Sequence, residues 1–240
     1  IGSGLVGSEM CIRDSKVSVH TFDIKSKVTR KINVPVDADG YIPRIRFTQD
    51  PNKLAVMTLN RHQNRFDLYF ADPRSTVAKL ALRDESDTYI RENVFDNIVF
   101  YPENFSFVSE KSGYNHLYWY SIGGNLLKQV TAGPYEVQEF LGYDPEEGSF
   151  YFSSNEESPM RSAIYKTRLS SQAGTNSAQF SANMKYYMNR YSNLDTPTVI
   201  TLNDNTGKTL ATLMDNAALK QDISCLLYTS PSPRDRSLSR

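Results

Sequence analysis

Alternation between apolar and polar residues is the dominant pattern of this chain, and it recurs in short segments. It is clearest over residues 105–133, where a period of two is interrupted at Ser112-Gly113 and again at Gly123-Gly124. Period-two segments separated by glycine-containing pairs are typical of antiparallel strands joined by tight turns. This stretch is therefore predicted to form a meander of three short strands.

The same plan recurs on both sides of the meander. The anchor pairs Leu68-Tyr69, Leu117-Tyr118 and Ile164-Tyr165 lie 49 residues (68 to 117) and 47 residues (117 to 164) apart. A repeat of about 40–50 residues with four strands is typical of a β-propeller blade. Each blade must bury its faces against neighbouring blades, because one twisted sheet cannot form a core alone.

The pattern predicts an all-β fold, a β-propeller of four-stranded antiparallel blades. About four blades are complete, and residues 17–32 supply part of a fifth. Four blades can close a small ring, but the truncated first unit favours an arc of a larger ring. The predicted strands are 41–47, 54–59, 66–71 and 77–82; 94–100 and the three of the meander; 137–143, 150–153 and 163–169; and 177–180, 185–189, 198–202 and 209–213.

The two ends of the chain lack this pattern. Residues 1–15 and 225–240 resemble translations of sequencing-adapter DNA and are predicted to be disordered, which leaves 16–224 as the folded part. Both cysteines, Cys11 and Cys225, lie in these end segments, so residues 16–224 form neither a disulfide nor a thiolate metal site. The G-x-G-x-x-G match at residues 2–7 follows no strand and opens no helix, so it is not read as a dinucleotide site.

Composition excludes several classes of partner. The chain has 27 basic and 27 acidic residues, and this balance gives no reason to expect a nucleic-acid partner. No apolar run approaches the length of about 18–20 residues that a membrane helix needs. A Tyr- and Phe-rich chain of 240 residues with 39% hydrophobic residues is typical of a folded β-rich protein.

Four phrases within residues 16–224 resemble a known family. They are YIPRIRFTQDPNKLAVMTLNRHQNRFDLYFAD, SEKSGYNHLYWY, VTAGPYEV and LMDNAALK. They look like the propeller of bacterial dipeptidyl peptidase IV and prolyl tripeptidyl peptidases, serine peptidases of the prolyl oligopeptidase clan.

The resemblance implies an eight-bladed propeller joined to an α/β-hydrolase domain that carries a Ser-Asp-His triad. Such enzymes cleave after proline or alanine near a free N-terminus, and the propeller restricts entry to short peptides. It also implies a homodimer in the periplasm or at the cell surface, with no cofactor. This chain would hold the last half of the propeller and end before the catalytic domain.

Catalytic groups are not expected in this chain. It contains no G-x-S-x-G nucleophile motif, and a triad needs a histidine held between two partners. The three histidines, His20, His62 and His116, are interpreted as structural or solvent-facing, and their spacing does not fit a metal site. We therefore predict no catalytic residue, no metal and no peptidase activity for the chain alone.

Binding residues are also sparse. The acidic pairs Glu146-Glu147 and Glu156-Glu157 are interpreted as solvated turn residues, because the family's substrate-binding acids precede the segment present here. In the resembled family the loop at residues 89–93 faces the cavity, so Arg91 is a candidate for contacting a substrate carbonyl, with a surface charge as the alternative. A different hypothesis for the whole chain is a free-standing β-propeller that serves as a protein-interaction scaffold.

Overall fold

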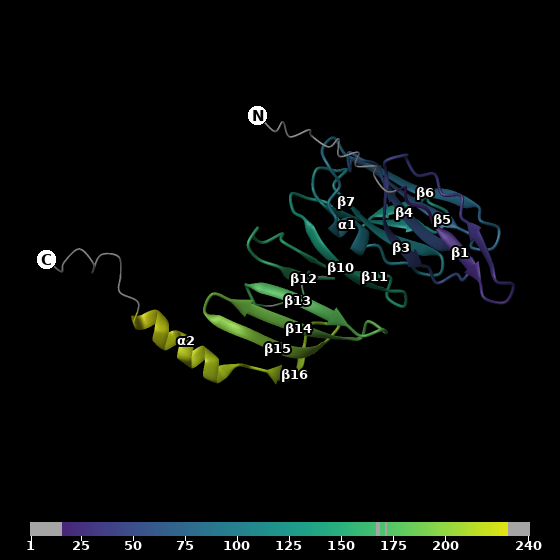
Figure 1. The fold of residues 1–240 in the computed structure, drawn as a ribbon. Helices are drawn as coiled ribbons and strands as arrows, with labels where there is room; N and C mark the ends of the chain where they lie inside the picture. The colour runs from purple at the N-terminus through teal and green to yellow at the C-terminus, as the bar shows by residue number, and fades with distance from the viewer. Residues whose placement is uncertain (1–15, 167–168, 171, 230–240) are drawn as a thin grey trace, which may run out of the picture. The chain divides into compact units, whose positions relative to one another are not determined.

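The computed structural model describes residues 16–166, 169–170 and 172–229, and within these ranges the fold is all-β (Figure 1). Sixteen strands and two helices are present in the described ranges, and the paired strands are antiparallel neighbours in chain order. The chain divides into a first unit, residues 1–107 with 119–127, and a second unit, residues 108–118 with 128–240. The all-β prediction is confirmed, whereas the number of blades and the size of a ring stay predictions.

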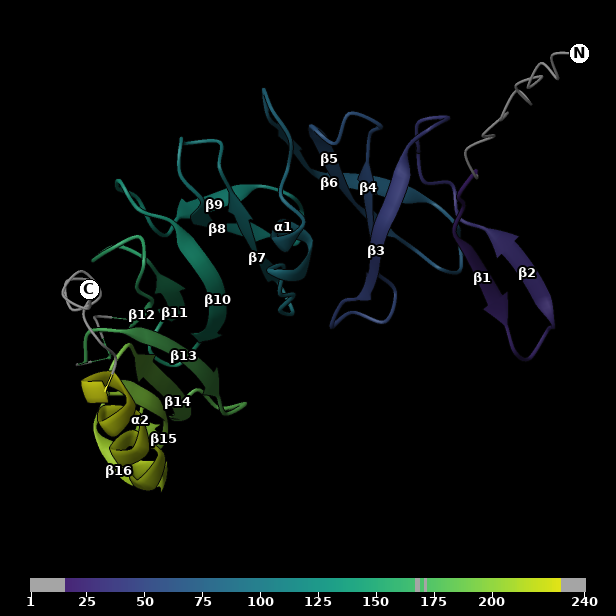
Figure 2. The same ribbon diagram turned by 60° about the vertical axis from the view of Figure 1, so that its left-hand side comes forward.

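The core of the first unit is a four-stranded sheet, whose strands lie side by side (Figure 2). Its strands are β3 (Tyr41–Phe47), β4 (Leu54–Leu59), β5 (Arg65–Ala71) and β6 (Ala78–Glu85). The two central strands are buried along almost their whole length, because both of their faces are covered. The predicted bounds of β3 and β4 are confirmed, and those of β5 and β6 differ by one to three residues.

A hairpin precedes this sheet, formed by β1 (His20–Asp23) and β2 (Val28–Lys31). Its turn is fixed by the carboxylate of Asp23, which accepts the backbone N–H groups of Lys25 and Ser26 at 2.8 and 3.0 Å. A short carboxylate that binds backbone donors two and three residues further on is a common way to stabilise a turn. The hairpin is the structured part of the truncated unit predicted at residues 17–32.

The meander is present as β7 (Asn104–Ser109), β8 (His116–Ser121) and β9 (Leu126–Gln129), a sheet that contributes residues to both units. Gly113 and Gly124 have φ values of +98° and +92°, the left-handed region that glycine adopts without strain. Both predicted turns of the meander are therefore confirmed.

The prediction of a strand at residues 94–100 is wrong. Residues 93–96 form the short helix α1 (Asn93–Asp96), and only Phe100 makes a single β-bridge, to Phe105. Val94, Phe95 and Ile98 are all buried, and this spacing suits one face of a helical turn as well as an extended segment. The sheet therefore has three strands instead of four.

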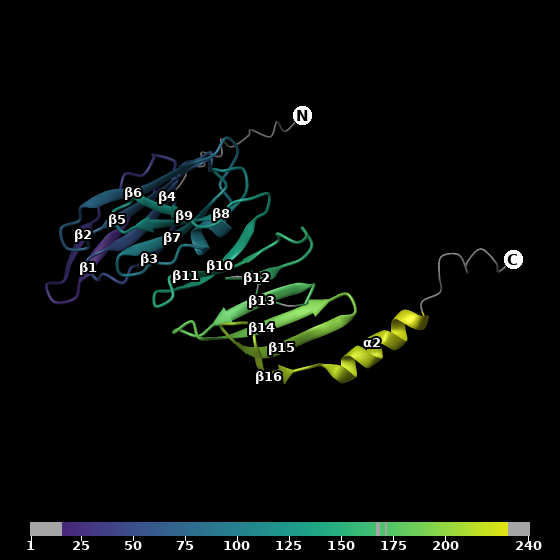
Figure 3. The ribbon, with the colours of Figure 1, turned by 180° about the vertical axis from the view of Figure 1, so that it is seen from behind.

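The second unit contains two further sheets, seen from behind in Figure 3. One consists of β10 (Val137–Asp144), β11 (Ser149–Ser154) and β12 (Ala163–Tyr165). The other consists of β13 (Thr175–Phe180), β14 (Tyr186–Asn193), β15 (Thr196–Asp204) and β16 (Thr209–Met214). The strand predicted at 163–169 is shorter than expected, because the N–H of Leu169 turns back to the carbonyl of Ile164 at 2.8 Å.

A second helix, α2 (Ala217–Thr229), follows β16 and was not predicted. The carboxylate of Asp215 accepts the N–H of Ala217 at 3.1 Å, and this contact supports the start of the helix. The helix includes residues 225–229, for which no regular structure was expected. The remainder of the two end segments, residues 1–15 and 230–240, lies outside the described residues.

Candidate functional site

The loop that joins β6 to β7 carries Arg91, the residue predicted to contact substrate. Its backbone is anchored on both sides of Arg91. The N–H of the buried Ile90 donates to the carbonyl of Gln63 at 2.7 Å, and the N–H of Val94 donates to the Arg91 carbonyl at 3.2 Å. The Arg91 side chain is exposed, so a fixed backbone presents a cation at the surface of the first unit.

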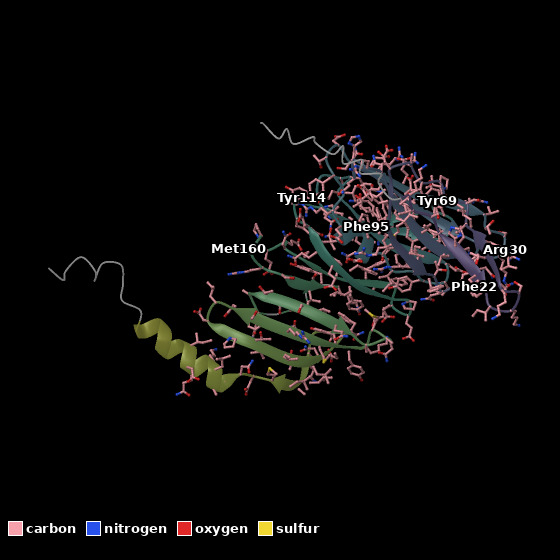
Figure 4. The ribbon with its side chains drawn as sticks, in the orientation of Figure 1. Phe22, Arg30, Tyr69, Phe95, Tyr114 and Met160 are labelled. Atoms are coloured by element: carbon pink, nitrogen blue, oxygen red, sulfur yellow. The ribbon has the colours of Figure 1, made fainter. Side chains whose placement is uncertain are left out.

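Phe95 fixes the same loop to the core of the first unit. Its ring stacks on Phe66 of β5 at 5.5 Å between centroids, and Phe66 stacks in turn on Phe107 at 5.6 Å. Figure 4 marks Phe95 among the densely packed side chains of this unit. Stacked rings that are fully buried add specific geometry to the apolar contact, and they hold α1 in one position.

A charge network ties α1 to β3. The carboxylate of Asp96 accepts hydrogen bonds from Arg44 Nε and Arg46 Nη2, each at 3.1 Å. Arg44 also contacts Glu92 at 3.3 Å, and Arg46 Nη1 donates to the carbonyl of Ile98 at 3.1 Å. The hydrogen bond from Arg44 lowers the pKa of Asp96. Because these side chains are at least one-third exposed, the network positions the loop more than it stabilises the fold.

This network was not predicted from the sequence. A signal was present, because Arg44 and Arg46 alternate with apolar residues in β3, and Glu92 and Asp96 are four residues apart. Acids at that spacing are close neighbours only if the segment is helical, because their Cβ atoms are then about 5–6 Å apart, whereas in a strand four residues span about 13 Å. The strand predicted there would have separated them.

A second polar cluster lies inside the four-stranded sheet. Asp67 is 5% exposed and accepts two hydrogen bonds from Arg83, at 2.7 Å from Nε and 2.8 Å from Nη2. The two residues are directly opposite each other in the β5–β6 register, and the hydroxyl of Tyr69 donates to Asp67 at 3.3 Å. The side chains of this cluster help to line a cavity of 90 Å³. With its carboxylate already satisfied, Asp67 is a structural acid.

The three histidines lie in three different surroundings. His20 contacts Ser18 Oγ at 3.0 Å on the exposed hairpin, and His62 is exposed in the turn between β4 and β5. His116 is 2% exposed, with Nδ1 at 3.1 Å from Thr131 Oγ1 and Nε2 at 3.0 Å from the Gly133 carbonyl.

The two contacts of His116 define its hydrogen-bonding state. Thr131 Oγ1 already accepts the N–H of Leu117 at 2.9 Å, so its own hydrogen is free to bind Nδ1, while Nε2 donates to the Gly133 carbonyl. This imidazole links β8 to the segment after β9 and acts structurally.

The acidic pairs occupy exposed turns. Glu146 contacts Lys185 at 3.0 Å, and Glu147 forms an ion pair with Lys166. The buried Asp144 accepts a hydrogen bond from Lys185 Nζ at 3.2 Å. Burial acts to raise the pKa of Asp144, but the hydrogen bonds from Lys185 and from the backbone of Glu146 and Glu147 outweigh it and lower that pKa. Asp144, Glu146 and Glu147 are therefore held by lysines of the same unit, and Glu156-Glu157 lies exposed in its turn.

Two further properties concern the whole described part of the chain. None of its helices is both long enough and apolar enough to span a membrane. Among the same residues, no group of three or more His, Cys, Asp or Glu side chains could hold a metal ion.

Comparison with protein families assigns the chain. Residues 12–198 match the model of the family described as "Dipeptidyl peptidase IV (DPP IV) N-terminal region". This match covers more than half of the chain, and the chain therefore belongs to this family.

Individual relatives agree with the assignment. The crystal structure of Porphyromonas gingivalis dipeptidyl peptidase 4 is 42% identical, with a TM-score of 0.84 over 87% of this chain and 31% of that one. A probable dipeptidyl peptidase 4 of Aspergillus flavus is 26% identical over 86% of this chain and 29% of the relative. A putative dipeptidyl aminopeptidase IV from Bacteroides ovatus, 23% identical with a TM-score of 0.69, covers 81% of this chain and 32% of that one and shows the fold alone. The chain thus spans less than a third of these relatives.

Proposed function

We propose that this chain is the non-catalytic propeller portion of a serine-type dipeptidyl or tripeptidyl peptidase. The observation that carries the proposal is its 42% identity to the dipeptidyl peptidase 4 of P. gingivalis over 87% of the chain, with a TM-score of 0.84. The described sheets serve as blades of an eight-bladed ring, with residues 16–224 as the propeller segment. An α/β-hydrolase domain outside this sequence supplies the nucleophile, because no G-x-S-x-G motif occurs here.

In this function the chain forms part of the wall of the substrate cavity. It admits short peptides with proline or alanine as the penultimate residue and keeps folded proteins from the catalytic centre. The full-length enzyme is a homodimer in the periplasm or at the cell surface and uses no cofactor. These properties follow from the family resemblance.

Arg91 is the residue of this chain that we assign to substrate contact. Its exposed guanidinium stands on a backbone fixed by Ile90 and Val94, next to the network of Arg44, Arg46 and Asp96. Because this backbone is already fixed, only the side chain of Arg91 loses conformational freedom when it donates to a peptide carbonyl. We place its contact at a carbonyl oxygen of the bound peptide.

A chimera tests the assignment to a peptidase. Residues 16–216 replace the aligned segment of the P. gingivalis enzyme, and hydrolysis of Gly-Pro-p-nitroanilide is measured. We expect a folded chimera that hydrolyses the substrate, whereas the isolated 240-residue chain should show no turnover. The control is the same chimera with the host's nucleophilic serine changed to alanine. A folded but inactive chimera contradicts the proposal, and turnover by the isolated chain contradicts the missing catalytic centre.

The role of Arg91 is tested in the active chimera. Because a hydrogen bond to a charged group contributes about 1.5–3 kcal/mol, Arg91→Ala should lower kcat/KM by about tenfold or more, mainly through KM. The matched control is Arg74→Ala, which removes another exposed arginine from the turn between β5 and β6. Equal kinetics for the two variants would show that Arg91 is an ordinary surface charge.

A further inference from the structure

The first unit contains a groove of 430 Å³ at the end of the sheet away from Arg91. It is formed by the turns after β3, β5 and β8 together with the start of β6. In an antiparallel sheet of consecutive strands, the turns after β3 and β5 lie at one end and those after β4 and β6 at the other. The groove and the Arg91 loop are therefore separate sites.

The wall of the groove is apolar. Phe70, Val77, Leu80 and Ile122 line it, and Val77 and Leu80 are 62% and 41% exposed. The ring of Phe70 is held at the base by edge-to-face contacts with Phe100 and Phe105, each at 5.8 Å between centroids. Apolar side chains left accessible in a concave surface of this size are typical of a small-molecule site.

The groove is formed without a ligand, because its turn from β8 is fixed. The N–H of Ile122 donates to the carbonyl of Glu103 at 2.7 Å, and the N–H of Gly124 donates to that of Ser121 at 2.9 Å. A Cβ atom at Gly124 would lie 2.1 Å from the carbonyl oxygen of Ala81, so the turn rests directly on β6. Ligand binding would therefore cost little conformational entropy in this wall.

The rim carries two lysines and two aspartates, and of the two lysines Lys53 alone has an ion-pair partner among the described residues. Asp50 pairs with Lys53 at 2.8 Å, and Asp72 accepts hydrogen bonds from the N–H of Arg74 and the hydroxyl of Ser75 at 2.8 and 2.9 Å. The carboxylate of Asp72 is bound by neutral donors and keeps its charge. Lys79 lines the same groove, is exposed, and forms no ion pair with any described residue. The groove thus offers a preformed apolar wall beside one available cation.

We propose that this groove binds a small apolar carboxylate. The hydrocarbon part lies against Phe70, Leu80 and Ile122, and the carboxylate accepts hydrogen bonds from the ammonium of Lys79. The apolar contact supplies most of the binding free energy, and the charge pair sets the orientation and the preference for an anion. This site is independent of the peptidase function proposed above.

Isothermal titration calorimetry of the full 240-residue chain with decanoate, below its micellar concentration, tests the site. We expect saturable binding of one decanoate per chain. Lys79→Gln should weaken binding about tenfold or more, the change expected when a charge-assisted contact is lost. Leu80→Ser should weaken it by a similar factor, because it removes part of the apolar wall. Decanol and decyltrimethylammonium, which match the hydrocarbon but not the charge, should bind more weakly than decanoate.

Matched variants outside the groove separate these effects from a general loss of structure. Lys128→Gln removes an exposed lysine of β9, and Leu210→Ser removes an exposed leucine of β16 that is 47% exposed. Both should bind decanoate as the parent chain does, and circular dichroism should show the same fold for all four variants. The proposal is overturned by absent or unsaturable decanoate binding, by equal binding of decanol, or by a folded Lys79→Gln that binds normally.

Discussion

At the scale of the residue, two buried acids of this fold are each paired with a basic side chain from another segment of the same unit. Asp67 accepts hydrogen bonds from Arg83, which lies directly opposite it in the β5–β6 register. Asp144 accepts a hydrogen bond from Lys185, the residue that precedes β14. A buried acid without such a partner would cost several kcal/mol. Such acids look misplaced in an apolar segment of sequence, and the pairing that explains them is visible only once the strand register is known.

Two buried tyrosines make stability sensitive to alkali. Burial raises the pKa of Tyr120 and Tyr187 to about 12, with the charges of Asp84 and Asp204 adding to the effect. A group with a raised pKa contributes its full stability below its unfolded value of 10.0, and this contribution is lost as pH rises toward 12. Each tyrosine should therefore contribute about 2–3 kcal/mol that disappears over this window.

Denaturant unfolding at several pH values between about 9 and 11.5 measures this contribution. Tyr120→Phe removes the titrating hydroxyl, so the variant should lose less unfolding free energy across the window than the parent chain. Tyr114→Phe is the control, because the Tyr114 side chain is 43% exposed. Parallel pH profiles for the parent chain and Tyr120→Phe would contradict the prediction.

At the scale of the element, tight turns position the sheets as much as the strands do. The turn from β8 to β9 rests on β6 through Gly124, whereas the turn from β7 to β8 has open space around Gly113. Both glycines have a positive φ, so they differ mainly in their surroundings. A substitution at Gly113 therefore reports backbone strain alone, whereas one at Gly124 reports backbone strain together with steric overlap.

Gly124→Ala and Gly113→Ala form a matched pair for this test. Each variant should lose about 1–2 kcal/mol of unfolding free energy, because alanine is strained at positive φ. Gly124→Ala should lose more unfolding free energy, since its Cβ would lie 2.1 Å from the carbonyl oxygen of Ala81. This overlap can be relieved only if the turn moves away from β6. Urea unfolding followed by the fluorescence of Trp119 compares the two. Equal losses would show that the turn does not depend on contact with β6.

The helix α1 could not be predicted from the local pattern of apolar and polar residues. Residues 94–100 contain apolar residues whose spacing is compatible with both an extended and a helical segment. The helix is selected by Phe95 stacking on Phe66 and by Asp96 meeting two arginines of β3. Those partners are about 30 to 50 residues away in the chain, so no local window could include them.

At the scale of the whole molecule, the repeat of strands and the family phrases agree with each other. The chain belongs to the dipeptidyl peptidase IV N-terminal region family, and the sheets follow one another as antiparallel meanders. The chain spans 31% of the P. gingivalis enzyme, so the activity of a whole peptidase belongs to the proposal made above. The chimera described above is therefore the appropriate test of function, because it restores the remainder of an enzyme.

The sequence by itself determined the all-β class, most strand positions and the turns at Gly113 and Gly124. These features depend on local periodicity and on backbone conformations that glycine adopts most easily. Tertiary structure alone decided the helix α1, the pairing of Asp67 with Arg83, and the groove that leaves Lys79 available. Each depends on which distant segment covers a given face, because burial and charge pairing are set by contacts between strands and not by spacing along the chain.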